Sequence, residues 1–222
     1  MTTLRVIEIF DSLQGEGYWT GLPMTFVRLS GCNAPVLGLD CLRWCDTPGA
    51  WDVAAGEEME VAEIVRRVRL PRLCLSGGEP LLQVDGVAEL LAAAHFRGIR
   101  VHVETNGTAG PIAGFDWVTV SPKPPAYLIA PGWEDLIDEL KLVADDHLDA
   151  ATAEWLAAEH PGAVICIQPE APGGPKAPGG PEAVAGAIAT PGPKSFERAI
   201  ALVMDHPEWR LSLQTHKFLG IR

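Results

Sequence analysis

Short runs of apolar residues recur along the chain, and their spacing predicts an α/β fold. Alternation of apolar and polar positions predicts strands at 4–10 and 24–30. From residue 60 onwards the pattern alternates between the two element types, with helices expected at 60–69, 84–97, 149–159 and 195–205, and strands at 72–76, 99–105, 116–121, 139–143, 163–168 and 209–214. Strands that are separated by helices and have nearly continuous apolar interiors are typical of a parallel sheet with right-handed crossovers.

The segments between these elements are of three kinds. Glycine-rich polar turns follow strand ends at 76–80, 104–108 and 121–125, where sites of parallel folds usually lie. Residues 32–52 have no clean period and are interpreted as a loop. Residues 169–194 are dominated by Pro, Gly and Ala, so we expect a flexible excursion rather than a domain boundary. The prediction is one domain over residues 1–222.

Composition narrows the function. With 47% hydrophobic and 21% charged residues, the 222-residue chain is expected to be globular. Its formal net charge of −12 argues against a non-specific nucleic-acid binder. No apolar run reaches the roughly 20 residues that a membrane span needs, and the N-terminus does not resemble a signal peptide. We therefore expect a cytoplasmic protein that binds neither nucleic acid nor membrane.

The five cysteines divide into two groups. Cys32, Cys41 and Cys45 are separated by eight and three residues, so their thiolates can converge on one metal centre. Spacing alone does not separate an iron–sulfur cluster from a zinc site, which would need a fourth ligand such as His95 or His102. Three thiolates would leave one iron of a four-iron cluster open to a small molecule. The other two cysteines, Cys74 and Cys166, lie in apolar runs and are expected to be small buried hydrophobes.

Three further motifs allow both a functional and a structural interpretation. LSGGEP at 75–80 offers a backbone anion nest and the carboxylate of Glu79. VETNGT at 103–108 and VSPK at 120–123 contain Glu104 and Lys123. Taken alone, LSGGEP is better explained as an ordinary turn, VETNGT also fits a turn, and a solvated loop lysine is the simplest interpretation of Lys123.

Together these motifs resemble a known family. A three-cysteine loop followed by a GGEP turn resembles the radical S-adenosylmethionine superfamily. LQGEG, CDT, ETNGT, SPK and LQTHK follow in the order found in the 7-carboxy-7-deazaguanine synthase family, which the chain resembles from residue 7 to its end. This order favours iron–sulfur over zinc.

The resemblance implies a fold, a reaction and partners. The fold would be a partial parallel β/α barrel with fewer helices than usual. With a [4Fe–4S] cluster, S-adenosylmethionine and Mg²⁺, a 5′-deoxyadenosyl radical would take a hydrogen atom from C6 of 6-carboxy-5,6,7,8-tetrahydropterin. Ring contraction with loss of ammonia would give 7-carboxy-7-deazaguanine, a step of queuosine-type 7-deazapurine biosynthesis. The family forms homodimers, and an electron donor such as flavodoxin or ferredoxin is expected.

The resemblance also assigns residues. The substrate would be bound by Leu13, Gln14, Gly15, Glu16, Arg28, Ser76, His216 and the terminal carboxylate of Arg222. S-adenosylmethionine would contact Gly78, Glu79, Ser121, Pro122, Lys123, Gln168, Pro169, Glu170 and Ala171. Cys32, Cys41 and Cys45 would ligate the cluster, and Thr47 would ligate Mg²⁺. Residues 215–222 are expected to reach the site without forming a further element.

Two alternatives remain open at this point. A radical activating enzyme that acts on a protein glycine would carry the same three cysteines and GGEP turn, but it has no need of LQGEG or LQTHK. A zinc-stabilised binding module without catalysis would use only the cysteines.

Overall fold

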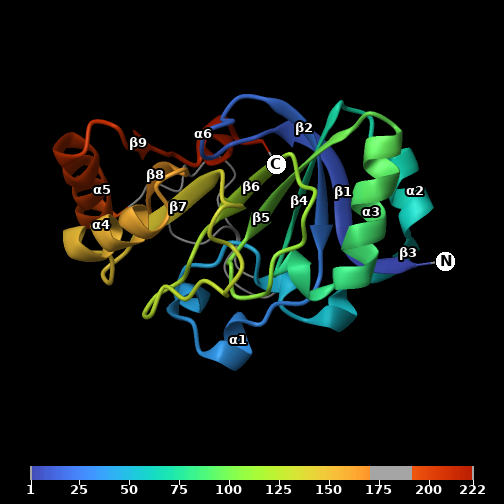
Figure 1. The fold of residues 1–222 in the computed structure, drawn as a ribbon, viewed down its shortest axis with the longest axis horizontal. Coiled ribbons are helices and arrows are strands. Elements are labelled where there is room, and N and C mark those ends of the chain that lie inside the picture. Colours follow the sequence, from blue (N-terminus) through green and yellow to red (C-terminus); the bar gives the residue numbers. More distant parts are fainter. Residues whose placement is uncertain (1, 171–191, 222) are drawn as a thin grey trace.

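The computed structural model of the chain describes residues 2–170 and 192–221 (Figure 1). Residues 171–191, which make up most of the Pro- and Gly-rich segment, lie outside the described residues. The predicted site residues Ala171 and Arg222 lie outside them as well.

A single sheet organises the described part of the chain. Its nine strands follow the order β3-β1-β2-β4-β5-β6-β7-β8-β9. They are β1 (Thr3–Leu13), β2 (Pro23–Leu29), β3 (Glu57–Glu60), β4 (Arg72–Gly77), β5 (Arg100–Thr105), β6 (Trp117–Val120), β7 (Glu139–Ala144), β8 (Val164–Pro169) and β9 (Arg210–Leu211). All neighbours from β2 to β9 are parallel, as predicted. However, β1 pairs antiparallel with β2 and with β3, a strand that the sequence did not predict.

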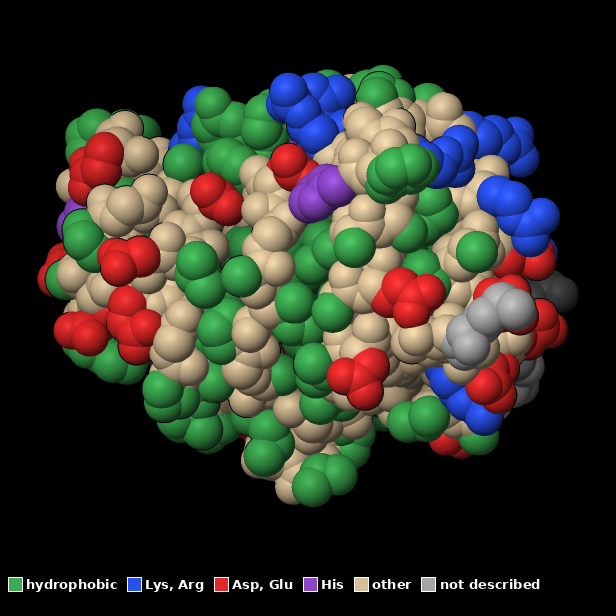
Figure 2. Space-filling view, turned by 45° about the vertical axis from the view of Figure 1, so that its right-hand side comes forward, with side chains coloured by type: hydrophobic (Ala, Val, Ile, Leu, Met, Phe, Trp, Pro, Cys, Tyr) green, Lys and Arg blue, Asp and Glu red, His purple; other side chains and the backbone are tan. Residues whose placement is uncertain are grey.

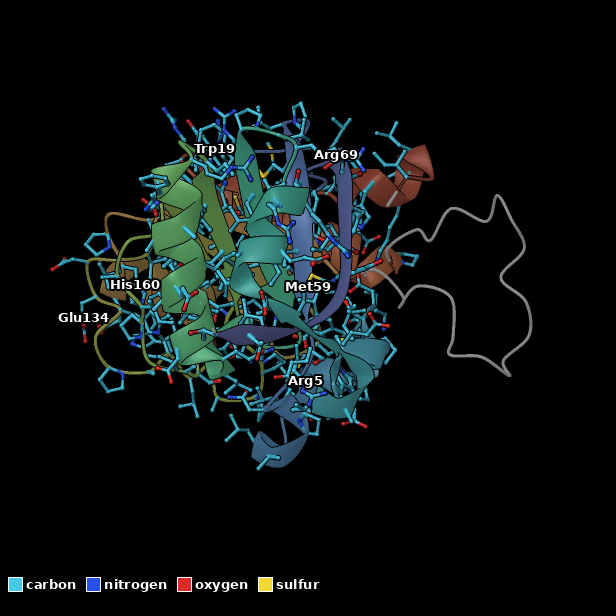
Figure 3. The ribbon with its side chains drawn as sticks, turned by 90° about the vertical axis from the view of Figure 1, so that its right-hand side faces the viewer. Arg5, Trp19, Met59, Arg69, Glu134 and His160 are labelled. Carbon is cyan, nitrogen blue, oxygen red and sulfur yellow. The ribbon has the colours of Figure 1, made fainter. Side chains whose placement is uncertain are left out.

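Helices cover the two ends of this sheet. Near β1 lie α2 (Val61–Arg67) and α3 (Val84–Phe96), which pack side by side in Figures 1 and 3. Near β7 and β8 lie α4 (Ala150–Glu159) and α5 (Pro193–Asp205). Each helix turns one face to the core, as the 3.6-residue period requires. In α3 that buried face consists of Gly86, Val87, Leu90, Leu91 and Ala94.

The middle of the sheet has no helical cover. The connections 106–116 and 121–138, both fully described, contain no helix. Instead, Tyr127, Trp133 and Ile137 of the second connection are buried in the main hydrophobic core. Loop side chains thus replace the missing helices. The predicted partial parallel barrel with few helices is confirmed.

Two segments at opposite ends of β2 position the site. The β1–β2 connection, residues 14–22, precedes β2, and the cysteine loop follows it. The cysteine loop is mostly irregular, as expected, but includes the short helix α1 (Ala34–Leu37). The C-terminal residues do form an element, α6 (Thr215–Leu219), which the sequence did not predict. Figure 1 shows α6 close to the β1–β2 connection.

Charge is distributed broadly over the face in Figure 2. Most Lys and Arg side chains lie toward its upper end and right-hand side, and Asp and Glu are scattered from its left-hand end to its right-hand side. Hydrophobic side chains are visible at the lower end, which is where α1 lies in Figure 1. The acidic excess is therefore not gathered in one patch on this face.

Candidate active site

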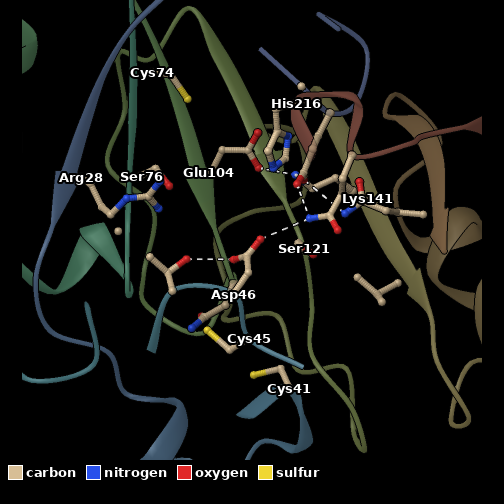
Figure 4. A pocket seen from close by; sticks show the side chains of 18 of the residues that line it. Arg28, Cys41, Cys45, Asp46, Cys74, Ser76, Glu104, Ser121, Lys141 and His216 are labelled. Atoms are coloured by element: carbon tan, nitrogen blue, oxygen red, sulfur yellow. Dashed lines mark hydrogen bonds and ion pairs between the residues drawn. The ribbon is translucent and has the colours of Figure 1, made fainter. Parts of the chain in front are cut away.

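One pocket of about 710 Å³ collects most of the predicted site residues (Figure 4). All three glycine-rich turns at the strand ends contribute to its wall. The predicted residues that line it are Leu13, Gln14, Gly15, Glu16, Arg28, Cys32, Cys41, Cys45, Thr47, Ser76, Gly78, Ser121, Lys123, Gln168, Pro169, Glu170 and His216. These residues come from segments far apart in the sequence.

Glu79 and Pro122 do not line this pocket. Glu79 is fully buried, and its carboxylate accepts hydrogen bonds from Thr105 Oγ1 at 2.7 Å and the Asn106 amide at 2.7 Å. A third bond comes from the Leu81 amide at 3.1 Å. Glu79 therefore ties the end of β4 to the end of β5, and the backbone of Gly78 faces the pocket in its place.

The cysteine loop forms one end of the pocket. Cys32 follows β2, Cys41 lies in a 3₁₀ turn, and all three thiols of the loop are free. Two N–H groups point at sulfur, since Ala34 N lies 3.5 Å from Cys32 Sγ and Trp51 Nε1 lies 3.3 Å from Cys45 Sγ. Donors of this kind tune the sulfur ligands of iron–sulfur clusters.

The spread of these sulfurs bears on which metal they suit. Among the described residues, the three sulfurs do not form a group within 4.8 Å of one another. Thiolates on one zinc ion would lie about 3.8 Å apart, given Zn–S bonds of about 2.3 Å. His95 and His102, considered as a fourth zinc ligand, do not line the pocket, and His95 pairs with Asp116 at 2.9 Å. Three free thiols on one loop are thus available to a metal centre, and neither histidine is placed to complete a zinc site.

Gly78 brings the GGEP turn against this loop. A Cβ atom there would overlap the carbonyl oxygens of Gly31 and Ala50 and would lie 2.7 Å from Cys32 Cβ. The cysteine loop and the turn can pack this closely only because residue 78 has no side chain. The exposed backbone is then available to a ligand.

Lys123 lies beside the cysteine end of the pocket. Its ammonium group donates to Ser121 Oγ at 2.8 Å and sits 5.2 Å from the centre of the Trp44 ring. Burial lowers the pKa of Lys123, and the Cys41 thiol opposes that shift. A cation held here suits the carboxylate or hydroxyl groups of a bound cofactor.

Deep in the pocket, a lysine joins two carboxylates. Lys141 Nζ lies 2.7 Å from Glu16 Oε2 and 2.7 Å from Glu104 Oε2. Gln214 donates to Glu16 at 2.7 Å, and Gln14 donates to Glu104 at 3.2 Å. Figure 4 shows Glu104 and Lys141 close to His216.

The charges of this triad follow from burial and pairing. Burial would raise the pKa of Glu16, but the Lys141 ammonium holds it well below its usual value. Burial raises the pKa of Glu104, and the same ammonium opposes this only in part. Burial would lower the pKa of Lys141, but Glu104 and Glu16 raise it well above its usual value. The Lys141 ammonium therefore pairs with two carboxylates whose pKa values are shifted in opposite directions.

The C-terminal segment locks the LQGEG loop in place. Thr215 donates its amide and its hydroxyl to the Gly15 carbonyl at 2.8 and 3.0 Å. A Cβ atom at Gly15 would overlap the His216 ring. Lys217 pairs with Asp46 at 3.2 Å, which connects the segment to the cysteine loop as well. The LQTHK motif therefore joins both ends of the pocket.

Arg28 lies on β2 between those two ends. Its Nε donates to Glu8 Oε1 at 2.8 Å, and its guanidinium lies 6.0 Å from the Phe10 ring centre. The side chain keeps 22% of its surface exposed and lines the pocket. Arg28 therefore forms an ion pair with Glu8 and at the same time lines the pocket, where it is available to an anionic ligand.

Sequence reasoning missed Lys141 entirely and treated Glu104 mainly as part of a turn. Asp46 and Gln214, which also line the pocket, were not assigned. One signal was available, because a lysine between Leu140 and Leu142 is unusual in an apolar parallel strand. That signal indicates a buried charge but does not identify its partners.

Curated relatives resemble the chain over nearly its full length. It is 35% identical over 225 residues to the 7-carboxy-7-deazaguanine synthase of Synechocystis sp., covering 98% of this chain and 93% of that protein. It is 36% identical over 218 residues to the one from Bacteroides thetaiotaomicron, covering 98% of each chain. The chain belongs to the 7-carboxy-7-deazaguanine synthase family. A further member, from Bradyrhizobium diazoefficiens, is 37% identical over 241 residues, again covering 98% of each chain.

The fold of this family member also matches a solved structure. The crystal structure of QueE from Escherichia coli aligns with a TM-score of 0.67 at 24% identity, covering 95% of this chain and 93% of that one. No family model matches the chain. Within the described residues, no helix combines the length and apolarity needed to cross a membrane.

Proposed function

We propose that the chain is a radical S-adenosylmethionine lyase that converts 6-carboxy-5,6,7,8-tetrahydropterin to 7-carboxy-7-deazaguanine with loss of ammonia. The observation that carries the proposal is the pocket that joins the three-cysteine loop to the LQGEG and LQTHK motifs. Membership of the 7-carboxy-7-deazaguanine synthase family supports it.

The cysteine end would hold the cofactors. Cys32, Cys41 and Cys45 would ligate three irons of a [4Fe–4S] cluster, which together with S-adenosylmethionine supplies an organic radical. The backbone of Gly78 is available to the amino-acid end of that cofactor. The further contacts proposed for it are Ser121, Pro122, Lys123, Gln168, Pro169, Glu170 and Ala171. Glu79 would not touch the cofactor; its hydrogen bonds to Thr105 and Asn106 would hold the turn that exposes the backbone of Gly78.

The opposite end would hold the pterin. Its amino-pyrimidinone edge needs donors and acceptors in a fixed order, which Gln14, Glu16 and Glu104 supply. Arg28 would pair with the substrate carboxylate, with Ser76 nearby on β4. His216 would close this end, and burial lowers the pKa of its imidazole, which favours the neutral ring.

Gly15 provides a test of how the loop and the C-terminal segment meet. Gly15→Ala should displace His216, because the added methyl group overlaps its ring. We expect KM for the pterin to rise while stability falls by about 1–3 kcal/mol, the usual cost of overpacking. Steady-state kinetics and thermal melts would measure both. Gly162→Ala, where nothing lies within 4 Å, is the matched control. Normal KM in Gly15→Ala would show that His216 does not close the site.

Thr47 is proposed as a Mg²⁺ ligand beside the substrate carboxylate. Its hydroxyl now donates to Asp46 Oδ1 at 2.9 Å, and oxygen donors of this kind suit a hard cation. Thr47→Val keeps the shape but loses the oxygen, so turnover should fall by roughly tenfold or more while iron content stays unchanged. Thr47→Ser should keep most activity. Unchanged Mg²⁺ dependence in Thr47→Val would make Thr47 an ordinary loop residue.

The remaining parts of the proposal concern assembly. We propose one radical S-adenosylmethionine domain over residues 1–222, a homodimer, and a flavodoxin or ferredoxin as electron donor. The proposed substrate is a small molecule, the pterin.

Anaerobic reconstitution tests the function against its alternatives. An iron–sulfur enzyme should be brown, contain iron and sulfide, and convert the carboxy-tetrahydropterin to a carboxy-deazaguanine. A zinc-stabilised binding module would be colourless, and an activating enzyme would cleave the cofactor without converting the pterin. Either result would overturn the proposed function.

A further inference from the structure

The charge at the deep end of the pocket depends on one side chain. Lys141 lies in β7, every residue of which is buried, and its side chain is 7% exposed. Both of its ion pairs measure 2.7 Å, and both reach carboxylates from other segments, Glu16 in the β1–β2 connection and Glu104 in β5. Lys141 thus connects these two segments through one ion pair to each.

Apart from Lys141, no cation forms an ion pair with either carboxylate among the described residues. Glu104 otherwise accepts only the 3.2 Å hydrogen bond from the neutral Gln14 amide among its described bonds. Glu16 also accepts bonds from Gln214 and Gln168, which carry no charge. Besides Lys141, the titratable groups that act on the two carboxylates are His216, Asp46, Glu139, Cys74 and Lys123. Lys123 is a cation, but it donates to Ser121 and forms no ion pair with either carboxylate among the described residues. His216 can become a cation, but its burial favours the neutral ring.

We propose that Lys141 is a positioning residue, which holds Glu16 and Glu104 together as two ionised acceptors for the N–H donors of the bound heterocycle. The identity of that heterocycle rests on the proposed function. Without the ammonium group, two buried carboxylates would face each other, and one would take up a proton or turn away. A protonated carboxyl donates a hydrogen bond and no longer accepts two, so it would oppose the N–H edge of the ligand.

Three variants separate charge from packing. Lys141→Met keeps the length of the side chain and removes the charge, whereas Lys141→Arg keeps the charge and offers donors to both carboxylates. Lys194→Met, at an exposed position of α5, is the matched control. Iron content and circular dichroism would confirm that each variant folds and holds its cluster.

The kinetic expectation concerns substrate binding and its pH dependence. Lys141→Met should raise KM for the pterin on the order of tenfold or more, with a smaller change in kcat. Without the Lys141 ammonium, the pKa of Glu104 should be higher, and Glu104 should stay protonated up to a higher pH. In a plot of kcat/KM against pH, the midpoint of the rise should therefore lie about one pH unit or more above that of wild type. Lys141→Arg should restore the wild-type profile, and Lys194→Met should leave it unchanged.

A second measurement needs no substrate. In apo Lys141→Met, the folded-state pKa of Glu104 would lie above its unfolded value, so stability should be lost as pH rises from about 4.5 toward neutrality. Urea unfolding at several pH values should show this extra loss in Lys141→Met and not in Lys141→Arg or Lys194→Met.

The experiments distinguish an error about the role of Lys141 from an error about the proposed function. If wild type fails to convert the pterin, the proposed function is wrong, and the unfolding series still tests whether Lys141 holds the carboxylates ionised. If wild type converts the pterin and Lys141→Met keeps the wild-type KM and pH profile, the positioning role is overturned. Equal kinetic defects in Lys141→Met and Lys141→Arg would also overturn it, because charge would not be what matters.

Discussion

Replacing Cys45 by alanine is expected to abolish S-adenosylmethionine cleavage and to lower the iron content of the reconstituted protein. Cys45 is one of three thiols on the cysteine loop, and two N–H groups of that loop point at the sulfurs of Cys32 and Cys45. With one thiolate missing, the loop has too few ligands for a four-iron cluster with a single open iron. Iron and sulfide analysis, together with detection of 5′-deoxyadenosine, would measure the loss.

The two remaining cysteines provide the controls for this experiment. Cys166 is buried in β8 away from the pocket, and Cys74 lies at the opposite end of the pocket from Cys41 and Cys45 in Figure 4. Cys166→Ala and Cys74→Ala should both retain the iron content of wild type. Full cofactor cleavage in Cys45→Ala, or loss of iron in both controls, would contradict the assignment of the cluster ligands.

Replacing Arg28 by alanine is expected to have the largest effect on substrate binding. Arg28 lines the middle of the pocket, and Glu8 orients it through a 2.8 Å hydrogen bond. Losing a charged, bidentate partner of the substrate carboxylate should cost about 2–5 kcal/mol in kcat/KM. Arg28→Lys should not restore activity, because an ammonium group cannot form the planar fork of a guanidinium.

The defect should be confined to the substrate. Iron content and cofactor cleavage in the absence of pterin should stay near wild type in Arg28→Ala. Arg69→Ala provides a surface control, since that side chain is 82% exposed. Near-normal pterin kinetics in Arg28→Ala would reduce its role to the ion pair with Glu8.

Several parts of the fold were predictable because their sequence pattern reports burial directly. The apolar runs predicted β4, β7 and β8; the structure buries the three central residues of β4, all of β7, and all of β8 after its first residue. The strand β3 escaped prediction because its sequence, EEME, is polar and its residues are mostly exposed at the edge of the sheet. Similarly, α6 is too short for helix propensity to reveal, and it depends on contacts with Gly15.

The site likewise has a part that the sequence predicts and a part that only the fold brings together. The cysteines and glycines stand in short motifs, so the sequence identified the end of the pocket that they form. The triad of Glu16, Lys141 and Glu104 joins three segments more than 30 residues apart, and only the fold brings them together. The sequence also does not show in which direction a side chain points. Glu79, predicted to contact the cofactor, faces the core rather than the pocket.

In the proposed function, one pocket would place the radical source at the cysteine end within reach of the pterin at the Arg28 and Glu16 end. Turnover of the pterin carrying deuterium at C6 tests this most directly, with mass spectrometry of the recovered cofactor. We expect deuterium at the 5′ position of S-adenosylmethionine or 5′-deoxyadenosine, alongside formation of 7-carboxy-7-deazaguanine. Product formation with no deuterium at that position would contradict it.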